Sequence, residues 1–136
     1  MKSLDTLLKV AQRRLDDLGR EIAKLGQHLD ILRMEEAKLI AREQAEIALA
    51  MQDVSLMAMM PAYRQRVAQQ VALVRARTDQ AEALMVDMRA RLTAAYQEKS
   101  KFEELLKREA AREALARSAL EQSALDEAAI NRVGRY

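Results

Sequence analysis

Few side chains in this chain are of the types that carry out chemistry. The 136 residues include one histidine, His28, and no cysteine. Paired carboxylates can act as general acid and base, and adjacent pairs occur at Asp16-Asp17, Glu35-Glu36 and Glu103-Glu104. Neighbouring residues on a helix point in different directions, so these pairs should be solvated rather than convergent. No Gly-rich phosphate loop is present either. We therefore expect a protein that is not an enzyme, with no catalytic residues, no metal site and no cofactor.

A regular apolar spacing predicts the elements that hold these side chains. Apolar residues recur in alternating steps of four and three, which is the seam of a coiled coil. A first series comprises Leu4, Leu8, Ala11, Leu15, Leu18, Ile22, Leu25, Leu29 and Leu32. A second series follows the single proline and comprises Val67, Val71, Val74, Thr78, Ala81, Met85, Met88, Leu92, Ala95, Phe102 and Leu106. Two long heptad helices with one break predict an all-α fold: a long two-helix antiparallel coiled-coil hairpin with a C-terminal helical overhang.

The proline defines the expected break. Pro61 suits the first position of a helix, where its missing amide costs nothing, and Asp53 and Ser55 favour a turn before it. A helix that started at Ser55 would place Pro61 in its second turn and break a hydrogen bond there. We therefore predict a single coiled-coil domain over residues 1–136, with a first helix at about 3–52, a turn at about 53–60 and a second helix at about 61–132.

Acidic residues interrupt the first series after Leu32. The strict register would bury Glu36, Glu43 and Glu46, and burial of an unpaired carboxylate is costly. A shift of the stripe by one position would bury apolar neighbours instead. We therefore predict a stutter near residues 36–40 that brings in Ala37, Ile40, Ile47 and Met51.

The predicted hairpin leaves the end of its second helix without a partner. Folding the chain about residues 56 and 57 sets Leu32 opposite Ala81 and Leu39 opposite Val74. From Ala110 onward the apolar residues are scattered, at Leu115, Leu120, Leu125 and Ile130. A long helix without tertiary support is marginal in water, so we expect this overhang to dock onto another protein.

Composition excludes several classes of protein. The net charge of +2 is a small difference between 23 basic and 21 acidic residues, so it does not indicate a nucleic-acid-binding surface. Aromatic residues make up only 3% of the chain, too few for an ordinary globular core. No apolar run approaches the roughly 18 residues that cross a bilayer, and the N-terminus lacks a secretory signal. We expect a soluble, cytoplasmic chain without a transmembrane segment.

Three surface features stand apart from the seam. Gly19 and Gly26 lie seven residues apart on one flank of the first helix, either as tolerated surface glycines or as a point of close approach for another protein. Arg13 and Arg14 are candidates for a basic collar that binds a partner lined by acceptors. Methionines crowd the turn, where they either fold back onto the hairpin or form an adaptable docking surface; they are Met51, Met57, Met59 and Met60.

Three stretches of the chain are similar to one family. The run from Leu4 to Leu15, the stretch from Glu98 to Leu105 and the segment from Leu125 to Ala128 resemble the FliJ family of flagellar type III export proteins. The resemblance implies a stalk in the cytoplasmic export apparatus, peripheral to the inner membrane at the flagellar base. It also implies three partners: a hexameric export ATPase, the cytoplasmic domain of the export gate protein, and export chaperones.

The resemblance further implies binding residues. A gate-binding patch on both helices would comprise Glu35, Leu39, Arg42, Glu46, Val67, Val71, Val74 and Thr78. Arg42 and Glu46 depart from the family pattern, because relatives carry aromatic side chains there, and the valines also fit the seam. Residues at the open end and in the overhang would bind the ATPase; they are Arg13, Arg14, Leu115, Leu120, Leu125 and Ile130.

Two other functions remain compatible with these residues. One is a chaperone that clasps unfolded export substrates with its methionine-rich tip and seam. The other is a scaffold or tether that dimerises through its ends. Within the first interpretation, a flagellar and an injectisome export system are both compatible with the sequence.

Overall fold

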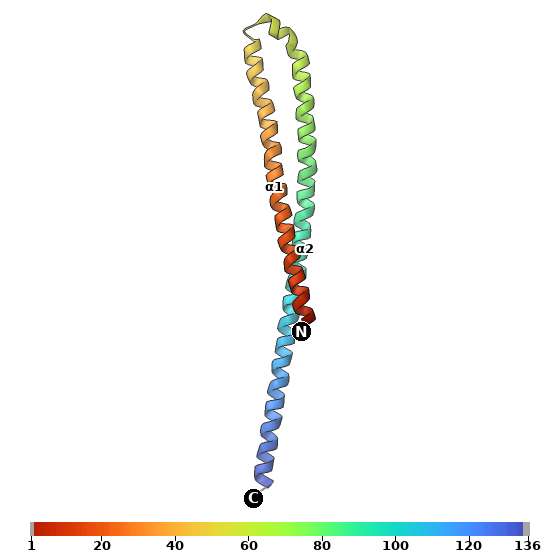
Figure 1. Ribbon diagram of the computed structural model, residues 1–136, viewed down its shortest axis with the longest axis vertical. Coiled ribbons are helices and arrows are strands. Elements are labelled where there is room, and N and C mark those ends of the chain that lie inside the picture. The colour runs from red at the N-terminus through yellow and green to blue at the C-terminus, as the bar shows by residue number, and fades with distance from the viewer. Residues whose placement is uncertain (1, 135–136) are drawn as a thin grey trace. The chain divides into compact units, whose positions relative to one another are not determined.

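The computed structural model describes residues 2–134, which form two helices. Helix α1 spans Lys2–Ala50 and helix α2 spans Val54–Gly134, and Figure 1 shows them running in opposite directions from a short connection. No strand occurs in the described residues. The predicted all-α hairpin of two long helices is confirmed. Within residues 2–134, neither helix contains an apolar stretch long enough to cross a membrane.

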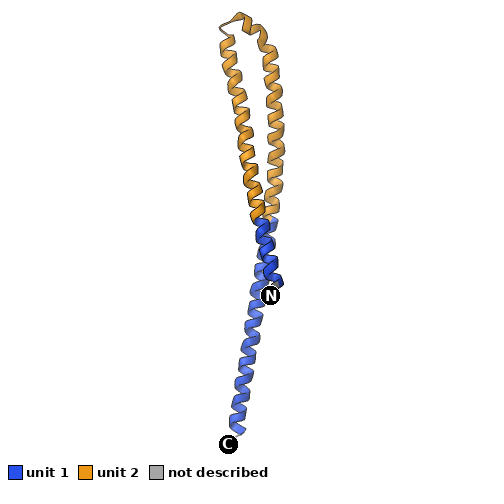
Figure 2. Ribbon diagram, viewed as in Figure 1, with its two compact units in different colours: residues 1–15, 94–136 blue, residues 16–93 orange. Residues whose placement is uncertain are grey.

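The chain divides into two compact units (Figure 2). The hairpin unit comprises residues 16–93, which contain most of α1, the connection and the first part of α2. The terminal unit comprises residues 1–15 together with residues 94–136. Both helices continue from one unit into the other, so the units share elements rather than being separate domains in sequence.

The heptad seam forms the core of the hairpin unit. Leu29, Leu32, Val74, Ala81 and Met85 make one cluster of buried side chains, and Leu39 packs against it. This cluster contains both predicted pairs, Leu32 with Ala81 and Leu39 with Val74. Further along α2, Val67, Val71, Thr78 and Met88 are also buried at the predicted heptad positions. The apolar spacing therefore predicts which residues of the two helices share this cluster.

The terminal unit contains further buried seam residues, followed by a part of α2 that has no partner helix. Ala11, Leu15 and Ala95 are buried, and Phe102 and Leu106 are half-buried. From residue 110 to residue 134 every residue of α2 is exposed. This segment, which we call the overhang, is the unpartnered helix that the sequence predicts.

The start of α2 differs from the prediction. The helix begins at Val54, so the connection is only residues 51–53, and Pro61 lies inside the helix. Asp53 explains the early start, because its carboxylate accepts hydrogen bonds from the backbone N–H of Ser55 at 3.0 Å and from the Ser55 hydroxyl at 2.7 Å. Its backbone carbonyl accepts from the N–H of Met57 at 3.1 Å. These bonds form an N-cap that starts the helix seven residues before Pro61.

Pro61 instead bends α2 near its start. A proline within a helix removes one backbone hydrogen bond, and its ring clashes with the preceding turn. Figure 1 shows the first turns of α2 lying across the end of the hairpin unit before the helix bends to run alongside α1. These first turns form a tip that presents its own side chains at the end of the hairpin.

Candidate interaction surfaces

The adjacent carboxylates that could carry out chemistry form ion pairs instead. Within residues 2–134 no group of three or more His, Cys, Asp or Glu side chains could hold a metal ion. Each adjacent carboxylate pair has at least one member in a salt bridge: Asp17 with Arg20, Glu36 with Arg75, Glu103 with Lys99, and Glu104 with Arg108. His28 is exposed. These carboxylates are solvated or ion-paired, as the sequence predicts for residues that do not converge.

Two acidic residues nevertheless lie in the seam, where a stutter was predicted to avoid them. The side chains of Glu36 and Glu43 are each only 23% exposed. The Nε of Arg75 lies 2.6 Å from Glu36 Oε1, and the Nε of Arg64 lies 3.5 Å from Glu43 Oε1. The seam can keep its register through these carboxylates because α2 supplies a cation to each of them.

The predicted stutter at residues 36–40 is therefore wrong. Ala37, Ile40 and Met51 are exposed, whereas Ile47 is half-buried and Glu46 is exposed. The departure from the strict register is confined to positions 46 and 47, one heptad later than predicted. An ion pair across the helices makes the earlier shift unnecessary.

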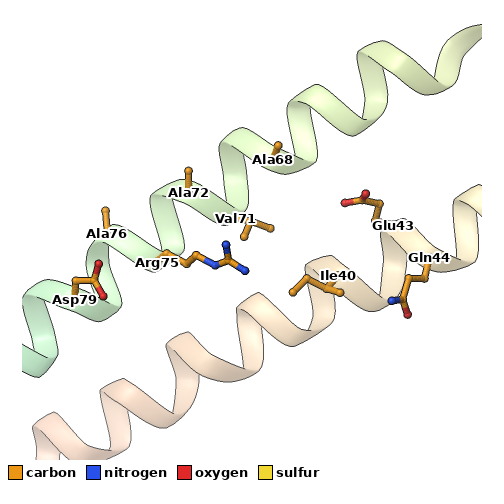
Figure 3. Close-up of a pocket in the computed structure, with 9 residues that line it drawn as sticks. All are labelled: Ile40, Glu43, Gln44, Ala68, Val71, Ala72, Arg75, Ala76 and Asp79. Carbon is orange, nitrogen blue, oxygen red and sulfur yellow. The ribbon is translucent and has the colours of Figure 1, made fainter.

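Grooves flank the seam at this level of the hairpin unit. One groove of about 610 Å³ is lined by both helices, with Ile40 and Glu43 from α1 and Val71 and Arg75 from α2. Figure 3 shows Val71 and Ile40 pointing toward one another, and Arg75 extending into the space between the helices. A second groove of about 280 Å³ is lined by Leu39, Arg42, Tyr63, Arg66, Val67 and Gln70. Both grooves are shallow channels between helices, with charged side chains along their edges.

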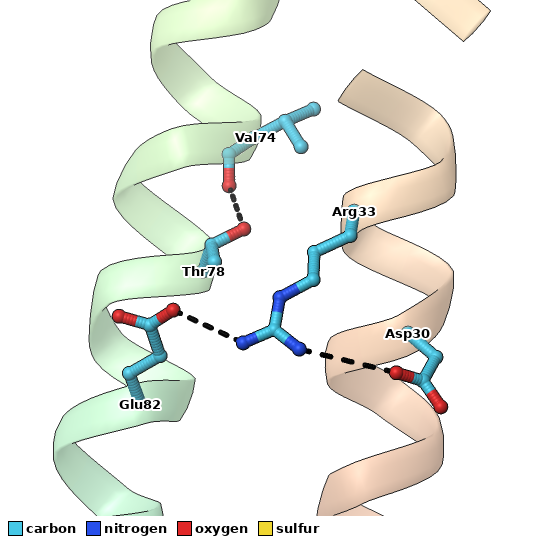
Figure 4. A network of polar contacts seen from close by, with 5 residues as sticks. All are labelled: Asp30, Arg33, Val74, Thr78 and Glu82. Carbon is cyan, nitrogen blue, oxygen red and sulfur yellow. Dashed lines mark hydrogen bonds and ion pairs between the residues drawn. The ribbon is translucent and has the colours of Figure 1, made fainter. Parts of the chain in front are cut away.

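A polar network joins the two helices further along the hairpin unit. Arg33 on α1 lies 3.3 Å from a carboxylate oxygen of Glu82 on α2 and 4.0 Å from one of Asp30, one turn earlier on α1 (Figure 4). The buried hydroxyl of Thr78 donates to the backbone carbonyl of Val74 at 2.9 Å. That bond explains how a polar residue occupies a seam position without an unpaired buried group.

The residues of the predicted gate-binding patch do not form one surface. Val67, Val71, Val74 and Thr78 are buried between the helices, so they present little surface to a partner while the hairpin is closed. Their position corresponds to the alternative that the sequence left open, in which the valines belong to the seam. Glu35, Arg42 and Glu46 are exposed on α1, and Leu39 is half-buried beside them. Only this α1 half of the predicted patch is accessible.

The predicted ATPase-binding residues all lie in the terminal unit and are all exposed. The apolar residues of the overhang are 65–72% exposed: Leu115, Leu120, Leu125 and Ile130. On α1, the guanidinium of Arg14 lies 3.2 Å from the carboxylate of Glu98 on α2. Asp17 pairs with Arg20 instead, so this acidic neighbour does not neutralise Arg14. Arg13 is also exposed, and the structure places it one residue from an ion pair between the helices.

The structure also shows where the methionines of the turn and the two glycines of α1 lie. Met51, Met57 and Met59 do not fold back onto the hairpin but are more than half exposed, while Met60 is half-buried. A Cβ atom at Gly26 would lie 4.0 Å from Met85 Cε, an ordinary contact, and one at Gly19 would meet nothing within 4 Å. Neither of these glycines is required by packing within the chain.

The comparison with protein families extends over the whole chain. A family model described as the flagellar FliJ protein matches residues 1–136. No match was found among curated proteins or among solved structures. The family match covers both helices, the connection and the overhang, and it confirms the resemblance carried by the three stretches of the sequence. The chain belongs to the FliJ family of flagellar proteins.

Proposed function

We propose that this protein is a non-enzymatic stalk of the flagellar type III export apparatus, whose overhang enters the ring of the export ATPase. Membership of a flagellar family supports the setting, and that family is not one of known enzymes. The observation that carries the proposal is the overhang, in which every residue from 110 to 134 is exposed. A protein of this kind would act at the cytoplasmic side of the inner membrane, at the flagellar base.

The distribution of apolar side chains around the overhang favours a partner that surrounds it. Leu115, Leu120, Leu125 and Ile130 are spaced five residues apart. Because each residue turns an α-helix by about 100°, each step of five turns it by roughly 140° beyond a full turn. The four side chains therefore point in different directions around the helix. A second helix would cover only one of these directions, whereas the wall of a pore covers all of them.

The distribution also argues against the scaffold hypothesis. Dimerisation of two overhangs as a coiled coil needs a continuous apolar stripe, and a spacing of five residues does not provide one. Arg13 and Arg14 lie in the same unit as the overhang. They would add a basic surface for acidic or carbonyl groups of the ATPase, because guanidinium groups donate several hydrogen bonds at once.

The export gate protein would bind the exposed α1 half of the patch. Glu35, Arg42 and Glu46 are accessible, and Leu39 and Arg42 line a groove together with Tyr63 of α2. Tyr63 supplies an aromatic side chain in the groove that Arg42 lines, and Arg42 stands where relatives carry an aromatic residue on α1. The cytoplasmic domain of the gate protein would contact this groove rather than the buried valines. Export chaperones remain a third class of partner in this proposal.

The stalk proposal is tested by substitution within the overhang. A variant with Leu115→Gln, Leu120→Gln, Leu125→Gln and Ile130→Gln should keep its helix, because glutamine and leucine have similar helix propensities. Its affinity for the purified export ATPase, measured by co-sedimentation, should fall at least tenfold. A matched control carries Leu73→Gln, Leu84→Gln and Val86→Gln, which remove exposed apolar side chains from the hairpin unit. Equal ATPase affinity of the two variants would refute the proposal.

The gate contact needs a separate measurement. A variant with Arg42→Glu and Glu46→Lys should bind the cytoplasmic domain of the export gate at least fivefold more weakly, measured by isothermal titration calorimetry. Its ATPase affinity should stay unchanged, because the substitutions lie in the hairpin unit. Glu21→Lys with Lys24→Glu makes an equivalent charge exchange at exposed positions elsewhere on α1. Equal gate binding by both variants would place the contact elsewhere.

A further inference from the structure

The end of the hairpin unit carries a dense group of exposed apolar side chains. Six large side chains between residues 49 and 59 are more than a third exposed: Leu49, Met51, Val54, Leu56, Met57 and Met59. We call these six residues the tip patch. Met51 and Val54 reach 75% and 84% exposure. The seam does not cover these side chains, so the fold of the hairpin does not explain why they are apolar.

Local structure holds the tip patch at the end of the unit. The Asp53 cap begins α2 at Val54, and Pro61 lies two turns further on. The helical segment between them runs across the end of the hairpin unit (Figure 1). Most of the patch therefore sits on a short helical segment with a defined start and a defined bend. Such a segment can meet a partner helix without first folding.

The charge around the tip patch has one sign. The segment from Glu43 to Tyr63 contains three acidic residues and no lysine or arginine. Glu46 is exposed, and hydrogen bonds from the hydroxyl and the backbone N–H of Ser55 hold the pKa of Asp53 below its ordinary value. The Asp53 carboxyl group is therefore anionic at neutral pH. Anionic lipids and nucleic acids bind through cations, which this segment lacks.

We propose that the tip patch binds an amphipathic α-helix of a partner protein that carries lysine or arginine beside its apolar face. The apolar face would cover the patch, where unbranched methionine side chains adapt to different partner surfaces. The cations of the partner helix would lie near Glu46 and Asp53. This surface belongs to the hairpin unit and acts independently of ATPase binding by the overhang.

Designed peptides test the proposal on the full chain. The probe is a helical peptide of leucine and lysine, and its control is a leucine and glutamate peptide of the same length and pattern. Titration followed by fluorescence anisotropy should show at least tenfold tighter binding of the lysine peptide. A variant with Glu46→Gln and Asp53→Asn should reduce that preference at least threefold, while asparagine retains the helix cap.

Substitution of the patch locates the binding site. A variant with Met51→Gln, Met57→Gln and Met59→Gln should bind the lysine peptide at least tenfold more weakly and keep its unfolding temperature, because these side chains are exposed. The matched control carries Ile31→Gln and Met34→Gln, which are similarly exposed elsewhere in the hairpin unit, and it should bind like the unmodified chain. The ATPase affinity of the tip variant should not change.

Other results would overturn the proposal. Equal binding of both peptides would remove the charge preference, and unchanged peptide binding by the tip variant would remove the site. A concentration-dependent dimer that the tip variant abolishes would identify a second copy of this chain as the occupant. Binding to vesicles of phosphatidylserine that the tip variant abolishes would identify a lipid surface instead.

Discussion

The Nε of Arg75 on α2 lies 2.6 Å from Oε1 of Glu36, a carboxylate in the heptad seam of α1. A seam carboxylate without a cation would be unfavourable. The pair therefore lets the coiled coil continue in register past Glu36. It also favours the observed alignment of the two helices over alternatives that would leave the carboxylate unpaired. Glu43 and Arg64 repeat the arrangement closer to the tip.

Replacement of Glu36 by leucine should stabilise the hairpin unit. Leucine would fill a seam position with apolar surface, and exposed Arg75 would remain solvated, so we expect a gain of roughly 1–2 kcal/mol in the free energy of unfolding. Urea denaturation followed by circular dichroism measures this change. Glu35→Leu is the control, since Glu35 is exposed and its substitution should change stability by less than about 0.5 kcal/mol. A Glu36→Leu variant no more stable than the control would contradict this account of the seam.

Replacement of Gly19 or Gly26 by alanine should also stabilise the protein. A Cβ atom at either position meets no close neighbour, and alanine in a helix interior is favoured over glycine by roughly 0.5–1 kcal/mol. Thermal unfolding of each single variant measures the effect. If the glycines serve as a point of close approach for a partner, the same variants would gain stability and lose partner binding. A lower unfolding temperature would show that the helix needs glycine at that position.

The Asp53 cap predicts a specific dependence of stability on acid. The hydroxyl of Ser55, then its backbone N–H, lower the pKa of Asp53 from its ordinary value of 3.8. A lowered folded-state pKa means that the contribution is present above the unfolded-state pKa of about 3.8 and is lost as the pH falls through the folded-state pKa. The unfolding temperatures of the unmodified chain and of Asp53→Asn are measured at pH values from about 5 down to about 2. The temperature of the unmodified chain should fall more steeply with decreasing pH, because only that chain loses the contribution of the carboxylate. Parallel curves would contradict a stabilising role for the carboxylate.

The basic residues near the open end should affect ATPase binding more than stability. Arg14 pairs with Glu98 on the surface, and such exposed pairs contribute less than about 1 kcal/mol. A variant with Arg13→Glu and Arg14→Glu should therefore unfold within a few degrees of the unmodified chain. It should bind the ATPase about tenfold more weakly at low salt, and the difference should shrink as salt screens the charges. ATPase binding that is unchanged at low salt would exclude a role for these arginines.

The fold was predictable because the heptad pattern is local and repeats along both helices. Leu32 and Ala81 lie in one buried cluster, as the spacing requires, and the overhang follows from the unequal lengths of the helices. The start of α2 was not predictable from Pro61, because the helix begins at the Asp53 cap and continues through the proline. That Glu36 stays in the seam could not be read from α1 by itself, because its ion-pair partner lies on α2. The predicted register combined with the charge of Arg75 would have suggested this partner.

The candidate surfaces were predictable only in part. In a coiled coil, the residues of the seam and the residues of a surface stripe both recur every seven positions. The sequence alone therefore allowed Val67 and Val71 to belong either to the seam or to a binding surface. Burial now distinguishes them, and it leaves Arg42 and Glu46 as the accessible part of the patch. The sequence left the exposure of the tip methionines open, because it depends on how the first turns of α2 lie at the end of the hairpin unit.

One binding measurement tests the central claim most directly. A chain that ends at residue 109 lacks only a segment whose described residues, 110–134, are all exposed, so it should retain the helical hairpin and its unfolding transition. The measurement compares the affinities of this shortened chain and the full chain for the hexameric export ATPase under the same conditions. The stalk proposal predicts at least a tenfold loss of affinity, or about 1.4 kcal/mol. Binding of the shortened chain within twofold of the full chain would contradict the proposal that the overhang enters the ATPase ring.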